Sequence, residues 1–464
     1  MTSTDNQPAD APILVIFGIT GDLSRRKLLP ALYHIFSQEL LPANTKIIGV
    51  SRRPLDVNDL LGNVELCVLE KDNVCDPEGI RRLKDALESF QLDPGNQADF
   101  IRLKDRLTEL DGANGDQREH LFYMSIPPEA YTPIVEQLGK NGLNDRRSRV
   151  LLEKPFGYDS ASAQALITLV DTYFSEEQVY RIDHYLAKET AQNLLTFRLY
   201  NPIFSSLWNA EHIERVEIRA TETIGIEGRA EFYEKTGALR DLVQSHLLQL
   251  LAITLMDLPA DMSSGEIHRT KQYFLEQLLP ADPNLAVRGQ YDGYKQEVQN
   301  EASTTESYAR VHLKHGAERW QGVDFVLDTG KGMAEKLTEI TVYFKTTHAH
   351  SSNNLTFNIQ PNEGITLDLI VKAPGIENQT THTTLDFDYQ KLYTDTQHID
   401  AYERVLMDAV RADQSLFSSD AEVLATWRVL QPILDKWSGN DDDLRRYAVG
   451  SAAGTITDTS VHVN

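Results

Sequence analysis

The stretch Ile13-Leu14-Val15-Ile16-Phe17-Gly18-Ile19-Thr20-Gly21-Asp22-Leu23 decides the fold of the first part of the chain. Its first five residues are all apolar, which is typical of a strand buried on both faces of a parallel sheet. Apolar residues then recur at helical spacing up to Ser37, and a second strand is predicted over residues 46–50. Strand, glycine turn, helix and strand form the opening unit of a doubly wound, Rossmann-like α/β domain.

The α/β alternation continues to about residue 180 and then gives way to a different pattern, helices first and alternating strands later. Such an order predicts an α+β domain with a large, mostly antiparallel sheet. Further strands are predicted over residues 121–126, 149–153, 214–220, 339–344, 355–359 and 365–371, and helices over residues 184–200, 238–256 and 400–438. We therefore expect a flexible amino terminus over residues 1–11, a dinucleotide-binding domain over 12–180, and an α+β domain over 181–464. The small, polar tail after Tyr447 is expected to be loose.

The composition excludes several classes of protein. The chain has 464 residues, with 45 Lys and Arg against 69 Asp and Glu, and a net charge of −24. Nucleic acids and anionic membranes bind basic surfaces, so we expect neither as a partner, whereas a phosphorylated substrate needs only a local basic group. No apolar run reaches the ~20 residues of a membrane span, and the amino terminus lacks a secretion signal. Cys67 and Cys75 lack C-x-x-C spacing, so we expect a cytoplasmic protein with reduced thiols.

Two groups in the first domain are candidates for binding a dinucleotide. Gly18 and Gly21 frame a turn in which backbone N–H groups and a helix N-terminus could approach a pyrophosphate, although the full G-x-G-x-x-G pattern is absent. Arg52 and Arg53 follow the second strand, where arginine favours the 2′-phosphate of NADP and a carboxylate would favour NAD. A tight strand–helix turn and a solvated loop would show the same two patterns.

The segment 181–189, Arg-Ile-Asp-His-Tyr-Leu-Ala-Lys-Glu, is the densest group of chemically active side chains. On a helix, His184 and Lys188 would share a face. Two neighbouring cations repel each other unless an anion lies between them, so the pair predicts a phosphate site. An amphipathic surface helix would have the same pattern.

Other histidines are weaker candidates. His246 lies in an apolar helical segment, where a histidine is more often a core residue than a catalyst. His348 and His350 are two positions apart, so on a strand they would lie on one face, as two metal ligands do. No cysteine or third histidine is near them in the sequence. We therefore discard a metal site.

Taken together, the segments resemble the glucose-6-phosphate dehydrogenase family from about residue 12 to residue 440. Any one of them could arise by chance, but all of them in the family's order could not. They are GITGDLSRRKL (18–28), EKPFG (153–157), RIDHYLAKE (181–189), ETIGIEGRAEFY (222–233), RDLVQSHLLQLL (240–251), RWQGVDFVLDTGK (319–331), IQPNEGI (359–365) and AYERVLMDAVRADQSLF (401–417).

The resemblance implies oxidation of C1 of β-D-glucose 6-phosphate to 6-phospho-D-glucono-1,5-lactone, with hydride transfer to NADP. This is the first step of the oxidative pentose phosphate pathway. His246 stands at the position of the family's general base, and Asp183 at that of the aspartate that hydrogen-bonds this base. The second domain would then carry the substrate and dimerisation surfaces. The implied protein is a homodimer, or a dimer of dimers, that needs no metal, and NAD is not excluded as the cofactor.

The resemblance also implies roles for other residues. His184, Tyr185 and Lys188 match the family's phosphate-binding residues, and Glu222 and Asp241 match carboxylates that receive sugar hydroxyls. Lys331 and Lys336 match two lysines that reach the substrate from the sheet domain. Lys154, before a proline whose peptide bond is cis in the family, and Lys27 match lysines near both substrate and cofactor. The turn residues Gly18, Thr20, Gly21, Asp22 and Leu23, with Arg52, match the cofactor site.

Four residues depart from the family's pattern. Ala187 and Ser245 replace the family's glycine and asparagine, and Asp324 and Asp328 replace proline and arginine. The two aspartates are expected to put negative charge near an anionic substrate and so to oppose its binding. Two alternatives therefore stay open: a dehydrogenase of another aldose or aldose phosphate, and a non-catalytic paralogue that binds NADP or a sugar phosphate.

Overall fold

The computed structural model describes residues 11–62, 64, 76–112, 118–346, 353–393, 399–440 and 442–457. The chain forms two compact units. Residues 1–157, 164–187 and 398–420 form the first unit, and residues 158–163, 188–397 and 421–464 form the second. The chain thus leaves the first unit after residue 187 and contributes a segment to it again near the carboxyl end. The predictions for residues 1–10, both cysteines, His348 and His350 lie outside the described residues.

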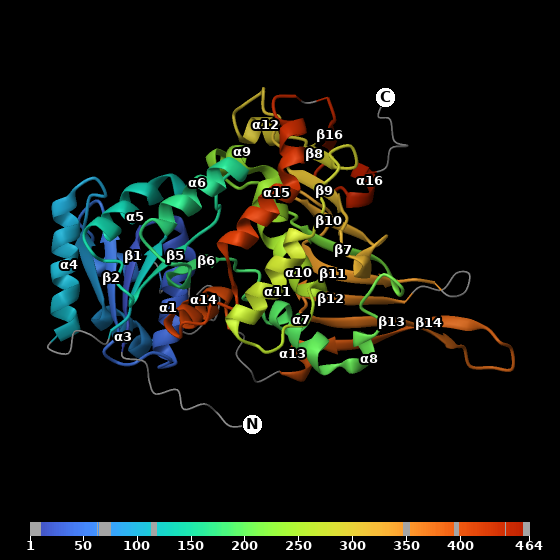
Figure 1. Cartoon of the computed structure of the whole chain (residues 1–464), viewed down its shortest axis with the longest axis horizontal. Helices are drawn as coiled ribbons and strands as arrows, with labels where there is room; N and C mark the ends of the chain where they lie inside the picture. Colours follow the sequence, from blue (N-terminus) through green and yellow to red (C-terminus); the bar gives the residue numbers. More distant parts are fainter. Residues whose placement is uncertain are drawn as a thin grey trace. The chain divides into compact units, whose positions relative to one another are not determined.

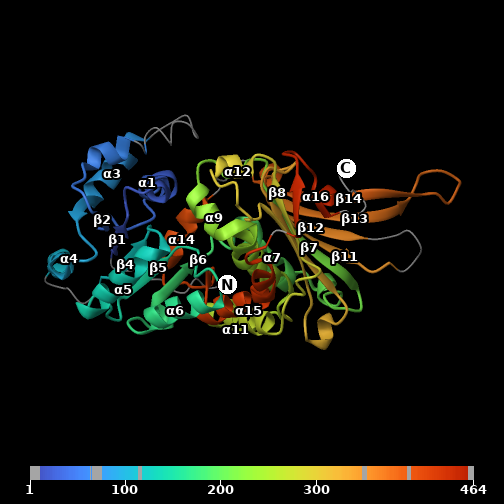
Figure 2. The same cartoon turned by 90° about the horizontal axis from the view of Figure 1, so that it is seen from above.

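The first unit is built on a sheet with the strand order β15-β6-β5-β4-β1-β2-β3. Strands β1 to β6 run parallel, and the short β15 pairs antiparallel with β6. Helices α1 and α3 lie on one side of the sheet, and α4 and α5 lie on the other (Figure 2). The strands are β1 (Ile13–Phe17), β2 (Lys46–Ser51), β3 (Leu87–Gln91), β4 (His120–Met124), β5 (Ser148–Leu152), β6 (Val179–Ile182) and β15 (Phe417–Ser418).

This order confirms the predicted doubly wound domain. It reverses between β1 and β4, and ligands of such sheets bind at the carboxyl ends of the strands flanking this point. All five residues of β1 are buried, as expected of a central strand. The helices are η1 (Ser24–Leu28), α1 (Leu29–Ser37), α3 (Pro77–Ala86), α4 (Gln97–Asp111), η3 (Pro128–Ala130), α5 (Tyr131–Lys140), η4 (Glu176–Gln178) and α14 (Ala401–Val410), while α6 (Ser160–Asp171) has residues in both units.

The second unit contains a nine-stranded sheet with the order β14-β13-β12-β11-β7-β10-β9-β8-β16 (Figure 1). Only the β7–β10 and β8–β16 pairs are parallel, which confirms the predicted mostly antiparallel sheet. The strands are β7 (Ile213–Thr221), β8 (Val287–Tyr291), β9 (Tyr308–Leu313), β10 (Asp324–Gly330), β11 (Leu337–Phe344), β12 (Asn354–Gln360), β13 (Gly364–Lys372), β14 (Thr380–Asp388) and β16 (Leu444–Tyr447).

Helices of the second unit pack on this sheet, with α7 against β12 and η5 against β7, β9 and β10. The helices are α7 (Glu189–Tyr200), α8 (Pro202–Ser205), α9 (Ala230–Ala238), η5 (Leu239–Leu247), α10 (Leu248–Leu255), α11 (Ser264–Glu276), α12 (Tyr294–Glu297), η6 (Glu318–Trp320), α13 (Tyr389–Leu392), α15 (Asp420–Trp437) and α16 (Ala453–Thr457). Among the described residues, none of the helices has the length and apolar character that crossing a bilayer requires.

Three predictions about local structure were wrong. The predicted helix over residues 400–438 is two helices, α14 and α15, with the strand β15 between them. Residues 184–187 form a turn, and α7 begins only at Glu189, so the predicted helix over residues 184–200 starts five residues too early. The described part of the tail after Tyr447 is ordered rather than loose, because Gly450 and Ser451 hydrogen-bond to Gly332 and Ala334 and Ile456 of α16 is buried among aromatic side chains.

Candidate active site

The glycine turn lies where β1 and β4 end. Gly18 has φ +80°, and a Cβ atom there would lie 2.3 Å from the carbonyl oxygen of Ser125. The amide of Gly21 donates to the Gly18 carbonyl at 2.8 Å, and the Ser24 hydroxyl donates to the same carbonyl at 3.1 Å. The chain therefore carries no side chain at Gly18 and Gly21, and hydrogen bonds fix its bend at the switch point of the sheet. This geometry fits a pyrophosphate.

The polar side chains around this turn are accessible. Thr20, Asp22 and Lys27 are exposed, and Leu23 is half-buried. Asp22 forms an exposed ion pair with Arg26 at 2.9 Å. Arg52 and Arg53 are also exposed and directly follow β2, the neighbour of β1, so two cations stand at the same sheet edge as the glycine turn.

Lys154 follows β5 and precedes a cis peptide bond to Pro155. Its neighbour Glu153 is fixed by two tyrosines of the same unit. The Tyr123 hydroxyl donates to the Glu153 carboxyl group, and the Tyr131 hydroxyl donates to the Glu153 carbonyl at 2.8 Å and accepts from its amide at 3.1 Å. Burial raises the pKa of Glu153 to about 7, against the opposing effects of Tyr123 and Lys154. Sequence reasoning missed this support, although the aromatic residue in β4 and the EKP segment were visible.

Asp183 begins the turn that replaces the predicted helix. Its buried carboxylate accepts the Tyr185 amide at 3.0 Å, and its carbonyl accepts the Leu186 amide at 3.1 Å. The rings of His184 and Tyr402 stack with their centroids 6.0 Å apart. His184 and Lys188 are therefore not on one helix face, and Lys188 instead occupies the N-cap position of α7.

In the second unit, Lys188 lies beside the end of β12. Its ammonium group donates to the side-chain carbonyl of Gln360, whose amide donates to the Thr338 hydroxyl at 3.0 Å. On the first turn of α7, the Thr190 hydroxyl donates to Glu363 at 3.0 Å. The N-terminus of α7 is thus tied to the loop after β12, which holds a cationic group at a helix N-terminus.

His246 and Asp241 lie on η5, a π-helix, and both are buried. Gly237 precedes η5 with φ +61°, and a Cβ atom there would lie 2.3 Å from the Glu306 carboxyl group. The same carboxyl group accepts the Leu239 amide at 3.0 Å and so caps the helix. Short π-helical turns shift side chains relative to an α-helix and are frequent at functional sites.

Glu222 and Lys331 meet at the ends of the parallel pair β7 and β10. Their side chains form an ion pair, and the Lys331 ammonium group lies 5.4 Å from the centroid of the Tyr233 ring. Lys331 is buried, whereas Glu222 is half-exposed. Lys336 is exposed just before β11. Because η5 packs on β7 and β10, the helix that carries His246 also borders the strands that end in this pair.

Asp324 and Asp328 each have basic partners on or just after β9, which weakens the expectation that they oppose an anionic substrate. Asp328 is fully buried and accepts from Arg310 at 3.0 Å, while burial raises its pKa to about 6. Asp324 lies 3.0 Å from His312 and 3.1 Å from Lys314. These basic partners offset the negative charge of both aspartates.

The other departures are small local changes. Ala187 is buried in the turn before α7, and the Ser245 hydroxyl donates to the Asp241 carbonyl at 3.0 Å within η5.

Within the described residues, one set of three carboxylates lies close enough together to share a metal ion: Asp171, Glu176 and Asp420. Arg181 of β6 already donates to Glu176 at 2.7 Å. The three carboxylates lie in α6, η4 and α15, which carry none of the candidate site residues.

Comparisons with known proteins agree with this geometry. Residues 15–193 match the family model described as "Glucose-6-phosphate dehydrogenase, NAD binding domain", and residues 195–462 match the corresponding "C-terminal domain". The glucose-6-phosphate 1-dehydrogenase 2 of Mycobacterium tuberculosis (strain ATCC 25618 / H37Rv) is 37% identical over 92% of this chain and 88% of its own length. The glucose-6-phosphate 1-dehydrogenase of Chlamydia muridarum is 35% identical over 96% of this chain and 94% of its own. A solved glucose-6-phosphate dehydrogenase in complex with its substrate glucose-6-phosphate superposes over 100% of both chains, with a TM-score of 0.91 and 30% identity.

Proposed function

Because the chain belongs to the glucose-6-phosphate dehydrogenase family, we propose that it oxidises C1 of β-D-glucose 6-phosphate to 6-phospho-D-glucono-1,5-lactone, with NADP as the hydride acceptor. The observation that carries the proposal is the placement of a buried imidazole, His246, on a helix that packs against β7 and β10. These strands lead directly to Glu222 and Lys331, a polar pair suited to sugar hydroxyls.

The reaction breaks the O–H bond of the C1 hydroxyl group and the C1–H bond of the sugar. His246 takes the proton of the C1 hydroxyl group, the hydrogen on C1 leaves with its electron pair, and the C1–oxygen bond becomes a carbonyl. The nicotinamide supplies the acceptor for the hydride. Asp183 takes the family's role of hydrogen-bonding the base, which favours one tautomer and stabilises the imidazolium that forms.

The remaining candidate residues bind the phosphate of the substrate, its sugar hydroxyls, or the cofactor. His184, Tyr185 and Lys188 take the phosphate, and Asp241, Glu222, Lys331 and Lys336 take the sugar hydroxyls. Lys154 and Lys27 stand where cofactor and sugar meet, and the turn Gly18, Thr20, Gly21, Asp22 and Leu23 takes the pyrophosphate.

NADP is the proposed cofactor rather than NAD because of the side chains after β2. Arg52 and Arg53 are both exposed and able to pair with a 2′-phosphate. No carboxylate occupies either position to accept a ribose hydroxyl, which is what favours NAD.

We also propose that the chain forms a homodimer, or a dimer of dimers, through the second sheet. Strands β13 and β14 end this sheet, and on one face they pair Leu367 with Leu385 and Ile365 with Phe387. The Leu385 side chain is 59% exposed, so this face resembles an uncovered apolar surface. Leu385→Lys should yield a monomer by light scattering, while Thr384→Lys on the opposite face should not. A dimeric Leu385→Lys variant would refute this surface.

His246→Asn tests the catalytic assignment. Removal of a general base should lower kcat by on the order of 10²–10⁴ with little change in KM. His312→Asn is the matched control, because that histidine pairs with Asp324 inside the sheet. Retained turnover in His246→Asn would refute the assignment. A panel of other aldoses and aldose phosphates separates the proposal from a dehydrogenase of different specificity, and absence of turnover on the whole panel would favour a binding protein.

A further inference from the structure

The backbone of Lys331 is held on both sides by residues that are not among the proposed site residues. Its amide donates to the Ser307 carbonyl at 2.9 Å, and its own carbonyl accepts from the Tyr447 hydroxyl at 2.7 Å. Tyr447 belongs to β16, more than a hundred residues later in the chain. All three residues are buried, so water cannot replace either hydrogen bond.

The Tyr447 hydroxyl is itself oriented by a second hydroxyl. The Ser307 hydroxyl lies 2.8 Å from it, and the amide of Tyr291 donates to the Ser307 hydroxyl at 3.0 Å. A phenol has one proton, and here that proton goes to the Lys331 carbonyl, so Ser307 must donate to Tyr447. The result is a directed chain of hydrogen bonds from Tyr291 through Ser307 and Tyr447 to Lys331.

The segment after Tyr447 closes over the same loop. The Gly450 amide donates to the Gly332 carbonyl at 2.7 Å, and the Ala334 amide donates to the Ser451 carbonyl at 3.0 Å. On the other side of this loop, the Met333 amide donates to the Glu222 carbonyl at 2.9 Å. Residues 331–334 are therefore held between the segment that begins with Glu222 and the carboxyl-terminal segment.

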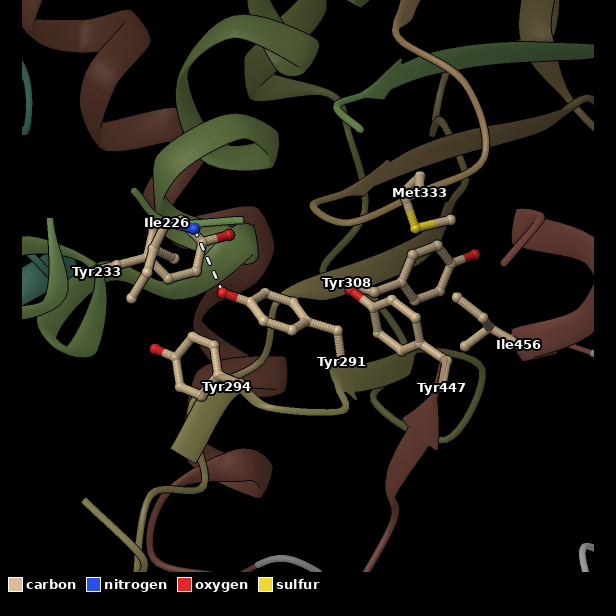
Figure 3. Close-up of a cluster of buried hydrophobic side chains, with 8 residues drawn as sticks. All are labelled: Ile226, Tyr233, Tyr291, Tyr294, Tyr308, Met333, Tyr447 and Ile456. Atoms are coloured by element: carbon tan, nitrogen blue, oxygen red, sulfur yellow. Dashed lines mark hydrogen bonds between the residues drawn. The ribbon is translucent and has the colours of Figure 1, made fainter. Parts of the chain in front are cut away.

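A cluster of tyrosines supports this arrangement (Figure 3). Tyr447 packs with Tyr291, Tyr308 and Ile456, and Ile456 comes from α16. The tail of the chain is thereby fixed to the core beside Lys331. The ammonium group of Lys331 pairs with the Glu222 carboxylate and lies over the face of the Tyr233 ring, so its position depends on where the Lys331 backbone is held.

We propose that Tyr447 is a positioning residue for Lys331, and that the carboxyl-terminal segment 444–457 thereby sets the affinity for the sugar part of the substrate. This inference rests on the proposed function, in which Lys331 binds a sugar hydroxyl. Tyr447 acts through Lys331 and touches neither the substrate nor the cofactor. Tyr447 would thus contribute to substrate affinity although it lies outside the motifs around the glycine turn and His246.

Tyr447→Phe removes one hydroxyl group and leaves the ring in the cluster. The Lys331 carbonyl then loses its donor while buried, and a lost partner of this kind costs enough to shift the loop. We expect KM for glucose 6-phosphate to rise about five- to thirtyfold, which corresponds to about 1–2 kcal/mol. The same factor should apply to free glucose, because the effect is on the sugar and not on the phosphate. KM for NADP and kcat should stay within about twofold.

Tyr294→Phe is the matched control, because it removes a hydroxyl of the same tyrosine cluster that bonds Glu234 at 2.8 Å rather than the Lys331 loop. It should leave KM for both sugars unchanged. An equal rise in KM in both variants would show general loosening and overturn the proposal, as would an unchanged KM in Tyr447→Phe. If Tyr447→Phe does not fold, Ser307→Ala weakens the same chain one step earlier and should raise KM in the same direction by a smaller factor; no rise would overturn the proposal.

The wild-type protein separates the two proposals. Turnover of glucose 6-phosphate by the wild type, with no KM change in Tyr447→Phe, refutes only the positioning role. A wild type that neither turns over nor binds glucose 6-phosphate, by kinetics and calorimetry, refutes the proposed function and the inference with it.

Discussion

Glu153→Gln changes the pH dependence of stability by an amount that the structure of the first unit specifies. Glu153 is buried beside Lys154, and burial raises its pKa to about 7 from an ordinary value of 4.5. Glutamine has nearly the same shape and can still accept the hydrogen bond from Tyr123. Burial also raises the pKa of Tyr123 well above its usual range, so this phenol remains a donor in neutral solution.

The sign of the effect follows from proton linkage. Between about pH 4.5 and pH 7 the folded protein holds the Glu153 proton that the unfolded chain releases, so rising pH favours unfolding in this window. Below this pH window, Glu153 does not change how the free energy of unfolding depends on pH. Above it, the destabilisation that the charged Glu153 causes is constant. The shift of about 7 − 4.5 pH units corresponds to about 3 kcal/mol at its full extent. Most of this, about 2 kcal/mol, should appear between about pH 5 and pH 8.

Urea unfolding followed by circular dichroism measures this difference. The free energy of unfolding of the wild type minus that of Glu153→Gln should become more negative by about 2 kcal/mol as the pH rises from about 5 to about 8. The comparison between variants cancels every other group that titrates in this range. A difference that stays constant with pH would show that Glu153 ionises normally and refute the reasoning. A difference that moves in the opposite direction would mean that the charged form is the one stabilised by the fold.

Three further predictions concern the ligand sites and the core. Lys188→Ala should raise KM for glucose 6-phosphate by about tenfold or more while leaving KM for glucose nearly unchanged, and an equal effect on both sugars would exclude a phosphate contact. Arg52→Ala should weaken the binding of NADP, measured by calorimetry, more than that of NAD; an unchanged ratio would remove this residue from the 2′-phosphate site. Lys271→Met leaves the fully buried Glu422 without the ion pair that it forms at 3.0 Å. This should cost about 3 kcal/mol in urea unfolding, and a loss below about 1 kcal/mol would contradict the importance of the pair.

The parts of the fold that the sequence predicted are those encoded locally. The apolar run of β1 and the glycine turn after it require no distant residue to be recognised, and the doubly wound sheet follows from them. Local periodicity predicted the wrong structure at His184. There the Asp183 carboxylate accepts the Tyr185 amide and forms a turn, which helical periodicity does not reveal. It failed again in the tail, where the isolated Ile456 is buried by residues far away in the sequence.

The candidate site shows the same limit. The family motifs supplied candidates for the residues that bind the ligands, but none for the residues that hold these candidates in place. Asp328 was expected to repel an anion because its partner Arg310 lies on another strand, and no spacing rule connects the two. Tyr447 was not a candidate for the same reason, since its contact with Lys331 joins residues more than a hundred positions apart.

The most direct test of the proposed reaction is the near-ultraviolet absorbance of the reduced nicotinamide, followed with purified protein and NADP. Glucose is added first and glucose 6-phosphate second. Prompt reduction of NADP on addition of glucose 6-phosphate, and far slower reduction with the same concentration of glucose, is the predicted result. No reduction with either sugar, in protein shown by circular dichroism to be folded, would contradict the proposed activity.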